Sequence, residues 1–234
     1  MNQCYNIFKK EFKAYFVSPI AYIVISVFLL VTGWFFFSTF FIYNQADMRI
    51  FFTLLPLVFA FIVPAITMRL FSEELHIGSY EILLTMPVTY TDVVLGKFMA
   101  AVVFIASMLV PTISYPIFIS FLGQLDWGPV IGGYIGAVFL GATFSAVGLF
   151  SSSLTKNQII SFIIGLAICF ALTLVERMLY FVPDNAVTFM EYLGANYHFQ
   201  NISRGIIDSR DILYFISVSF IGLYATSLVI QRKN

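Results

Sequence analysis

The residues that stand out lie in one polar connection, residues 69–97, between two apolar runs. The connection mixes acids with apolar residues, namely Glu73, Glu74 and Glu81 with Ile77, Tyr80, Leu83 and Leu84. This mixture predicts a short amphipathic helix at a surface. Pro87 ends the helix, because proline lacks the N–H that another turn would need and restricts the residue before it.

Nucleotide and metal chemistry are not expected in this chain. No Gly-x-x-x-x-Gly-Lys-Ser/Thr sequence occurs, and Gly96-Lys97-Phe98 lacks both the preceding glycine and the following hydroxyl that bind phosphate and magnesium. His76 and His198 are each isolated from a second ligand. A Ser-His pair, two aspartates or a His-Glu metal set on facing helices is also lacking. We therefore expect no cofactor and no enzymatic activity of its own.

A second group of charged residues lies near the C-terminal third of the chain. It comprises Glu176, Arg177, Arg204, Asp208 and Arg210. Charged groups at the border of an apolar segment are candidates for function. One reading places them at an outward gate or at a contact with an accessory partner. The other makes them hydrated ion pairs, which contribute little to stability.

The elements that position these residues follow from composition. Hydrophobic residues make up 60% of the 234 residues, against roughly 45 to 50% in soluble domains. Charged residues make up 10%, where about 25% is usual. Twelve basic residues balance twelve acidic ones, so no basic field for nucleic acid is present. The chain is expected to form one membrane domain over residues 1–234.

Six apolar stretches are long enough to cross a bilayer, which takes about 20 residues. They cover residues 20–43, 50–71, 93–122, 129–154, 158–181 and 212–230. In lipid each segment must satisfy its own backbone polar groups, so the stretches must be helices. The predicted fold is all-α, with six transmembrane helices and a connection over residues 73–92. Span four also holds Gly132 and Gly136, which indicate close packing, more within the subunit than between subunits.

Orientation follows from the positions of the basic residues, because Lys and Arg are retained on the cytoplasmic side. With six spans, eight basic residues lie on the side of the termini and four on the other. We therefore expect both termini to be cytoplasmic. Residues 1–18 predict a helix lying on the membrane, with Tyr5, Phe8, Phe12, Tyr15 and Phe16 on one stripe.

The connection also carries a family resemblance. Its sequence runs Ser72-Glu73-Glu74, Gly78-Ser79-Tyr80-Glu81, Leu83-Leu84, Met86-Pro87-Val88 and Gly96-Lys97. This order resembles the cytoplasmic loop of ABC-2 type permeases. The resemblance implies that the loop is a coupling helix seated in a groove of a separate ATPase subunit. The implied coupling positions are Glu73, Glu74, Gly78, Glu81 and Pro87, with Leu83 and Leu84 packing the helix.

The same resemblance implies the partners. ATP and magnesium would be bound by two ABC ATPase subunits on a permease dimer, formed by two copies or by a similar chain, in a bacterial inner membrane. In this family the dimer seam is attributed largely to spans one and five. Segments 10–19 and 198–215 are similar to gliding-motility-associated permeases and their relatives in nitrous oxide reductase maturation.

The expected function is that of a membrane subunit of an ATP-driven exporter. The alternative is a non-transporting anchor that transmits force from the ATPase to a periplasmic or membrane-anchored accessory protein. A secondary transporter is less favoured, because it would bind substrate and coupling ion through ionisable residues or broken helices at the membrane midplane. Spans one to four hold almost no such charges.

Overall fold

A computed structural model describes residues 3–43, 47–78, 89–178, 191–206 and 208–233, and all regular structure among them is helical. The first half contains α1 (Gln3–Val17), α2 (Pro19–Tyr43), α3 (Arg49–Thr67), α4 (Arg69–Ile77), α6 (Tyr90–Leu109), η1 (Val110–Ile113) and α7 (Ser114–Ser120). The second half contains α8 (Trp127–Leu154), α9 (Gln158–Met178), α11 (Ala195–Ser203) and α12 (Ser209–Arg232).

Six of these helical segments are long and apolar enough to cross a membrane. They are Pro19–Ile42, Arg49–Ile77, Tyr90–Ser120, Trp127–Leu154, Gln158–Glu176 and Ser209–Arg232. The prediction of an all-α fold with six membrane helices is therefore confirmed. Each helix satisfies its own backbone N–H and C=O groups, which a segment in lipid must do.

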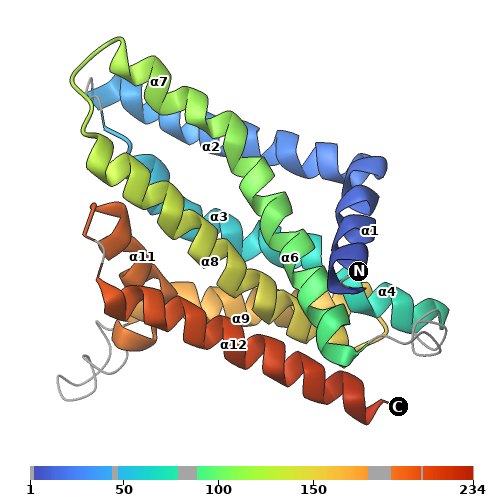
Figure 1. Cartoon of the computed structure of the whole chain (residues 1–234). Coiled ribbons are helices and arrows are strands. Elements are labelled where there is room, and N and C mark those ends of the chain that lie inside the picture. Colours follow the sequence, from blue (N-terminus) through green and yellow to red (C-terminus); the bar gives the residue numbers. More distant parts are fainter. Residues whose placement is uncertain (1–2, 44–46, 79–88, 179–190, 207, 234) are drawn as a thin grey trace.

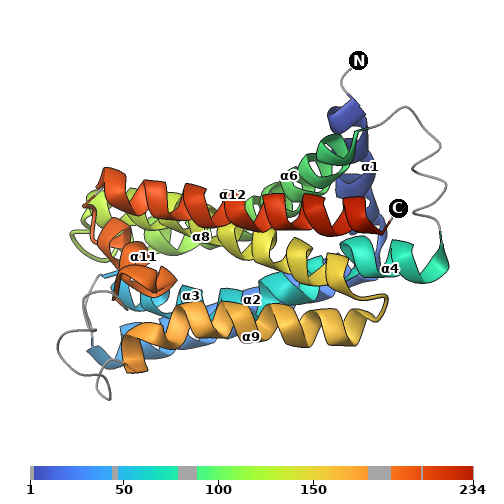
Figure 2. The same cartoon turned by 90° about the horizontal axis from the view of Figure 1, so that it is seen from below.

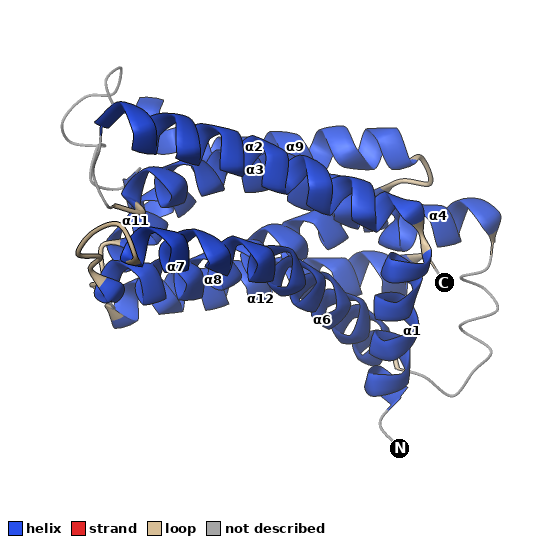
Figure 3. Cartoon of the chain, turned by 90° about the horizontal axis from the view of Figure 1, so that it is seen from above, coloured by secondary structure: helices blue, strands red, loops and turns tan. Residues whose placement is uncertain are grey.

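The spans form two layers (Figures 2 and 3). One layer holds α2, α3 and α9, and the other holds α6, α7, α8 and α12. Helix α8 touches α3, α9, α11 and α12. A side chain at Gly133 would collide with the Phe52 ring, and one at Gly148 would collide with Thr67. The small residues of α8 therefore serve packing within the chain, as expected.

The two ends of the bundle differ. Both termini, α1 and the tip of α4 lie at one end, and α11 lies at the other (Figure 1). Helix α1 crosses that end beside α6 (Figure 3). Tyr15 of the predicted aromatic stripe is buried, and Phe8, Phe12 and Phe16 are partly buried against the same core. The stripe thus packs largely on protein, while Tyr5 is exposed.

Two spans are interrupted, and their bounds differ from those expected. Span two continues past residue 71, because α4 follows α3 after a turn at Met68 and reaches Ile77. Span three is divided by the 3-10 helix η1, which contains Pro111. Proline cannot donate the backbone hydrogen bond of an α-helix, so the helix changes its winding there.

Candidate functional site

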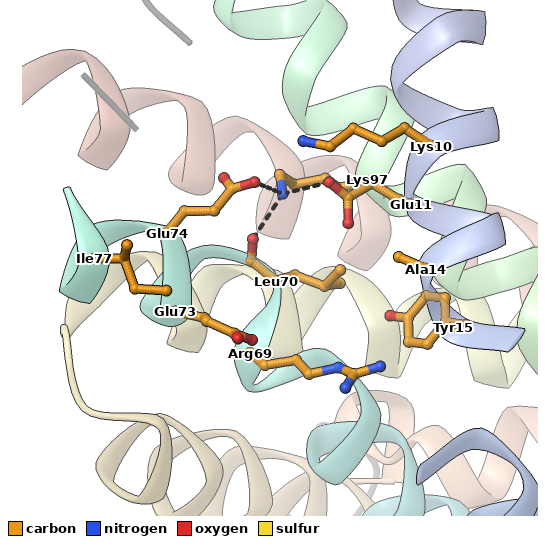
Figure 4. A pocket seen from close by; sticks show the side chains of 10 residues that line it. All are labelled: Lys10, Glu11, Ala14, Tyr15, Arg69, Leu70, Glu73, Glu74, Ile77 and Lys97. Carbon is orange, nitrogen blue, oxygen red and sulfur yellow. Dashed lines mark hydrogen bonds and ion pairs between the residues drawn. The ribbon is translucent and has the colours of Figure 1, made fainter. Parts of the chain in front are cut away.

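The candidate site surrounds Lys97, which α6 places at the end of the bundle that holds both termini. The Lys97 side chain is 1% exposed. Its Nζ donates to Glu74 Oε1 at 2.8 Å, to the Leu70 carbonyl at 2.8 Å and to Glu11 Oε1 at 3.0 Å (Figure 4). An ammonium group has three donors, so all of them are used. Lysine is almost never fully buried unless it is paired in this way.

Three elements meet at Lys97. Glu11 belongs to α1, Leu70 and Glu74 belong to α4, and Lys97 itself belongs to α6. The Phe71 ring lies 5.2 Å from Nζ and adds a cation–π contact. The ammonium therefore binds the N-terminal helix and the end of span two to span three.

Gly96 explains how α1 comes close enough to reach Lys97. A Cβ at position 96 would lie 2.9 Å from Ile7 Cβ and 3.0 Å from the Cys4 carbonyl oxygen. Any larger residue would push α1 away from α6. The Gly96-Lys97 pair thus has a structural meaning: the glycine admits the helix and the lysine pairs with it.

Tyr15 and Arg69 line the same site. The Tyr15 ring stacks on Phe104 at 4.7 Å, and Arg69 lies 5.3 Å from the Tyr15 ring centroid. Burial raises the pKa of the Tyr15 hydroxyl well above its ordinary value, and the Arg69 charge offsets this only in part. Tyr15 is therefore neutral, and its hydroxyl donates to the Ile66 carbonyl at 3.5 Å.

The junction between α3 and α4 is held by a serine from α8. The Ser152 hydroxyl accepts from the N–H groups of Phe71 and Ser72 at 3.0 Å each, and donates to the Met68 carbonyl at 2.7 Å. The first N–H groups of a helix have no partner within it. Ser152 supplies that partner for α4 and fixes the direction in which it leaves α3.

A cavity of about 360 Å³ opens beside these contacts. Its charged lining is balanced, because the three cations Lys10, Arg69 and Lys97 offset the three acids Glu11, Glu73 and Glu74. Among the described residues, Glu74 Oε2 is buried with no hydrogen-bond partner. The site is thus an ion-paired joint between helices, in which one buried carboxylate oxygen of the described residues lacks a hydrogen-bond partner.

The predicted coupling residues separate into three groups. Glu73 is exposed on α4, whereas Glu74 is half-buried in the ion pair with Lys97. Gly78 ends α4 with φ 78°, a left-handed conformation that suits glycine. Glu81, Leu83, Leu84 and Pro87 lie outside the described residues. The predicted connection 73–92 therefore begins as the last turns of span two, since α4 continues to Ile77.

The connection returns at Thr89, the N-cap of α6. The Thr89 hydroxyl accepts from the Asp92 N–H at 3.2 Å, and the Asp92 carboxylate accepts from the Thr89 N–H at 3.4 Å. This reciprocal capping box fixes the start of span three. The described part of the connection thus ends at Gly78 and resumes at Thr89.

The charged residues at the opposite end are only partly gathered. Glu176 of α9 accepts from Asn196 Nδ2 of α11 at 2.5 Å. Asp208 caps α12 by accepting from the Arg210 N–H at 3.0 Å. Arg204 and Arg210 are exposed, and the side chain of Arg177 lies outside the described part of the chain.

Asp211 and His198 form a buried pair, although the sequence shows no partner for His198. Asp211 is 2% exposed, not a surface charge, and its Oδ1 lies 2.6 Å from His198 Nδ1. His198, which is isolated in the sequence, also contacts the Tyr192 carbonyl through Nε2 at 3.0 Å and stacks on Tyr214 at 4.1 Å. An acid at the border of an apolar span requires a partner, and that signal points to Asp211.

Sequence reasoning also missed the role of Lys97 and Glu11. The sequence places Gly96-Lys97 at the end of the family pattern and Lys97 among the basic residues that orient the chain, but it indicates no partner for the lysine. One signal in the sequence could have indicated this role. Lys97 follows a glycine near the start of an apolar span, where its charge would be buried, and a buried charge requires a partner. The identity of that partner is not visible in the local sequence.

The sequence model of one protein family, described as "ABC-2 family transporter protein", matches residues 35–217. No curated protein matches the chain at a significant level. The matched range begins within α2 and ends within α12, so it includes α4, Lys97 and the connection between spans two and three.

Proposed function

Because the chain belongs to the ABC-2 family of transporter proteins, we propose that it is a permease subunit moved by separate ABC ATPase subunits through the joint at Lys97. The ATPases bind the connection between Gly78 and Thr89 and the exposed tip of α4. The ATP and its magnesium ion are held by those partner subunits. The chain itself contributes the membrane path and the helices that move.

One observation carries this proposal: the single ammonium of Lys97 links α1, α4 and α6. A push on the connection reaches α4 first, because α4 leads directly into it at Gly78. Ser152 and Lys97 then pass the displacement to α8, α1 and span three. Rigid helices and ion-pair networks are the elements that carry such coupling.

The two acids on α4, Glu73 and Glu74, have different roles. Glu73 is exposed and faces an incoming partner, together with Ile77, which is 69% exposed. Glu74 faces inward and holds Lys97. We propose that Glu73 and Glu81 contact the ATPase, with Leu83, Leu84 and Pro87 shaping the connection, while Glu74 transmits the movement.

Topology and assembly belong to the same proposal. Both termini are cytoplasmic in a bacterial inner membrane, because the end that holds them also carries the lysines of α1 and the C-terminal Lys233. Two copies pair through α2 and α9, which expose bulky apolar residues such as Leu30 at 70% and Ile159 at 68%. The gliding-motility type of system is the finer assignment, and it rests on the sequence resemblance in segments 10–19 and 198–215.

The proposal is tested on the full chain co-purified with its cognate ABC ATPase and reconstituted in nanodiscs. Glu73→Lys and Glu81→Lys place a repelling charge at the contact and are expected to reduce co-purification. The triple variant Lys97→Met, Glu74→Gln and Glu11→Gln removes the joint without leaving a charge on any of its three residues. It is expected to bind the ATPase normally but to lower permease-dependent ATP turnover at least about fivefold, the lower limit of usual coupling energies.

Arg210→Glu is the matched control, since it reverses an exposed charge at the opposite end of the bundle. Normal binding and turnover in Glu73→Lys and Glu81→Lys would refute the contact surface. An unchanged response in the joint variant would refute the role of Lys97. Turnover that changes the distances between spans without transport would favour the anchor that transmits force to an accessory protein.

A further inference from the structure

The end of the bundle opposite the termini holds a second polar cavity, of about 410 Å³. Arg49 at the start of α3 and Arg204 at the end of α11 line it together with Thr53, Gln200 and Ser203. Figure 1 shows α11 at this end of the bundle, and α11 contacts α3 there. Two arginines from segments far apart in the chain thus share one polar cavity.

Helix α11 is held firmly, so its polar face has a fixed position. Side chains at Gly132 and Gly136 of α8 would collide with or crowd Ile202 and Phe199 of α11. The absence of side chains on these two glycines lets the helices approach closely. The pairs Asn196–Glu176 and His198–Asp211 tie α11 to α9 and α12.

The cavity carries a positive charge. Arg49 Nε lies 3.4 Å from Asp47 Oδ2, and both side chains are largely exposed, at 69% and 40%. Arg204 has no ion pair within the described residues. The Thr53 and Ser203 hydroxyls already donate to the carbonyls of Arg49 at 2.8 Å and Gln200 at 3.0 Å. The donors left for a ligand are therefore the two guanidinium groups and the Gln200 amide.

Guanidinium groups are the donors that best match phosphate, because their planar fork forms two parallel hydrogen bonds to its oxygens. The position of the cavity relative to the membrane surface indicates which molecule carries that phosphate. Arg49 begins one span and Trp127, which is 48% exposed, begins another. Gly205 packs on Gly128 and Pro129, directly after Trp127. Exposed tryptophan at a span end is typical of the headgroup region.

We infer that this cavity binds the phosphate headgroup of an anionic membrane lipid through Arg49 and Arg204, in the leaflet opposite the termini. The inference needs no ATPase and is independent of the function proposed above. Free phosphate shares the same chemistry, so the experiment separates the two sources.

The test uses the purified full-length chain in detergent, titrated with a short-chain phosphatidylglycerol and observed by native mass spectrometry. Each of Arg49→Gln and Arg204→Gln is expected to weaken lipid binding about fivefold, as loss of one basic residue near an anionic headgroup does. Arg210→Gln removes an exposed arginine from the same end that does not line the cavity, and is expected to bind as wild type. The melting temperature of each variant without lipid confirms that it is folded.

A second experiment adds inorganic phosphate as a competitor of the lipid. If millimolar phosphate leaves phosphatidylglycerol binding unchanged, the lipid is the ligand. If phosphate binds instead, with the same loss in Arg49→Gln and Arg204→Gln, the cavity is a phosphate site but the lipid source is wrong. An equal loss in all three variants, or no loss in any, would overturn the site.

Discussion

Lys97 on α6 and Glu74 on α4 form an ion pair of 2.8 Å although 23 residues separate them in the chain. Glu74 also belongs to the predicted coupling connection, yet its carboxylate turns into the bundle. The acid next to it, Glu73, remains exposed. Two adjacent carboxylates of the same type therefore have different roles, which the direction of α4 decides.

Lys97→Met is expected to destabilise the protein by about 3 kcal/mol, the usual cost of leaving buried charges without their partner. Glu11 and Glu74, whose side chains are 13% and 18% exposed, would both lose the ammonium group that they share. Thermal unfolding of the purified chain measures the loss. Lys156→Met removes an exposed lysine and serves as the control. Equal unfolding temperatures for the two variants would contradict the role of the pair.

Ser152→Ala is expected to cost about 1–3 kcal/mol for each group that loses its partner. The variant would leave the N–H groups of Phe71 and Ser72 without the Ser152 hydroxyl, whereas the Met68 carbonyl would still accept from the Ser72 hydroxyl. Ser153→Ala is the matched control, because the Ser153 hydroxyl donates only to the Phe150 carbonyl of its own helix. Hydrogen exchange over α4 measures the effect, and unchanged protection there would show that Ser152 does not hold the junction.

Gly96→Ala is expected to displace α1 and to lower the unfolding free energy by about 1–3 kcal/mol, the usual cost of overpacking. The new Cβ would meet the Cys4 carbonyl, and a backbone atom cannot move aside without moving the helix. Gly128→Ala makes the same chemical change where the nearest atom is 3.4 Å away. A crosslink between α1 and α6 that forms equally well in both variants would argue against this close approach.

The Cys4 thiol is expected to report on the docking of α1. Burial raises the pKa of Cys4, and the Asp92 charge raises it further. Less of the reactive thiolate is therefore present at a given pH than for an ordinary thiol, and alkylation by iodoacetamide becomes fast only at higher pH. Asp92→Asn and Gly96→Ala should both shift the pH profile downward.

The Cys4→Ser variant measures the background alkylation, because the remaining cysteine of the chain, Cys169, is fully buried. A wild-type profile centred at the pH of a free thiol would show that α1 does not shield Cys4. A profile that moves with Asp92→Asn but not with Gly96→Ala would assign the shift to charge alone.

The prediction of six helices required only the sequence, because a bilayer demands about 20 apolar residues and complete backbone hydrogen bonding in each span. The same local logic identified the connection around Glu73, Glu74 and Gly78, whose polar residues interrupt two apolar runs. These features depend on neighbours in the chain, so a pattern of residue types reveals them.

The pairings needed the tertiary structure. Glu11 lies 86 residues from Lys97, and Asp211 meets His198 across two different helices. The residues next to Lys97 or His198 in the chain do not indicate which acid each one pairs with, because the crossing of helices decides which side chains meet. Arg49 and Arg204 reach one cavity for the same reason, since α11 folds back against α8. The sequence determined which residues must enter the membrane and which charges needed partners, and packing between helices alone decided those partners.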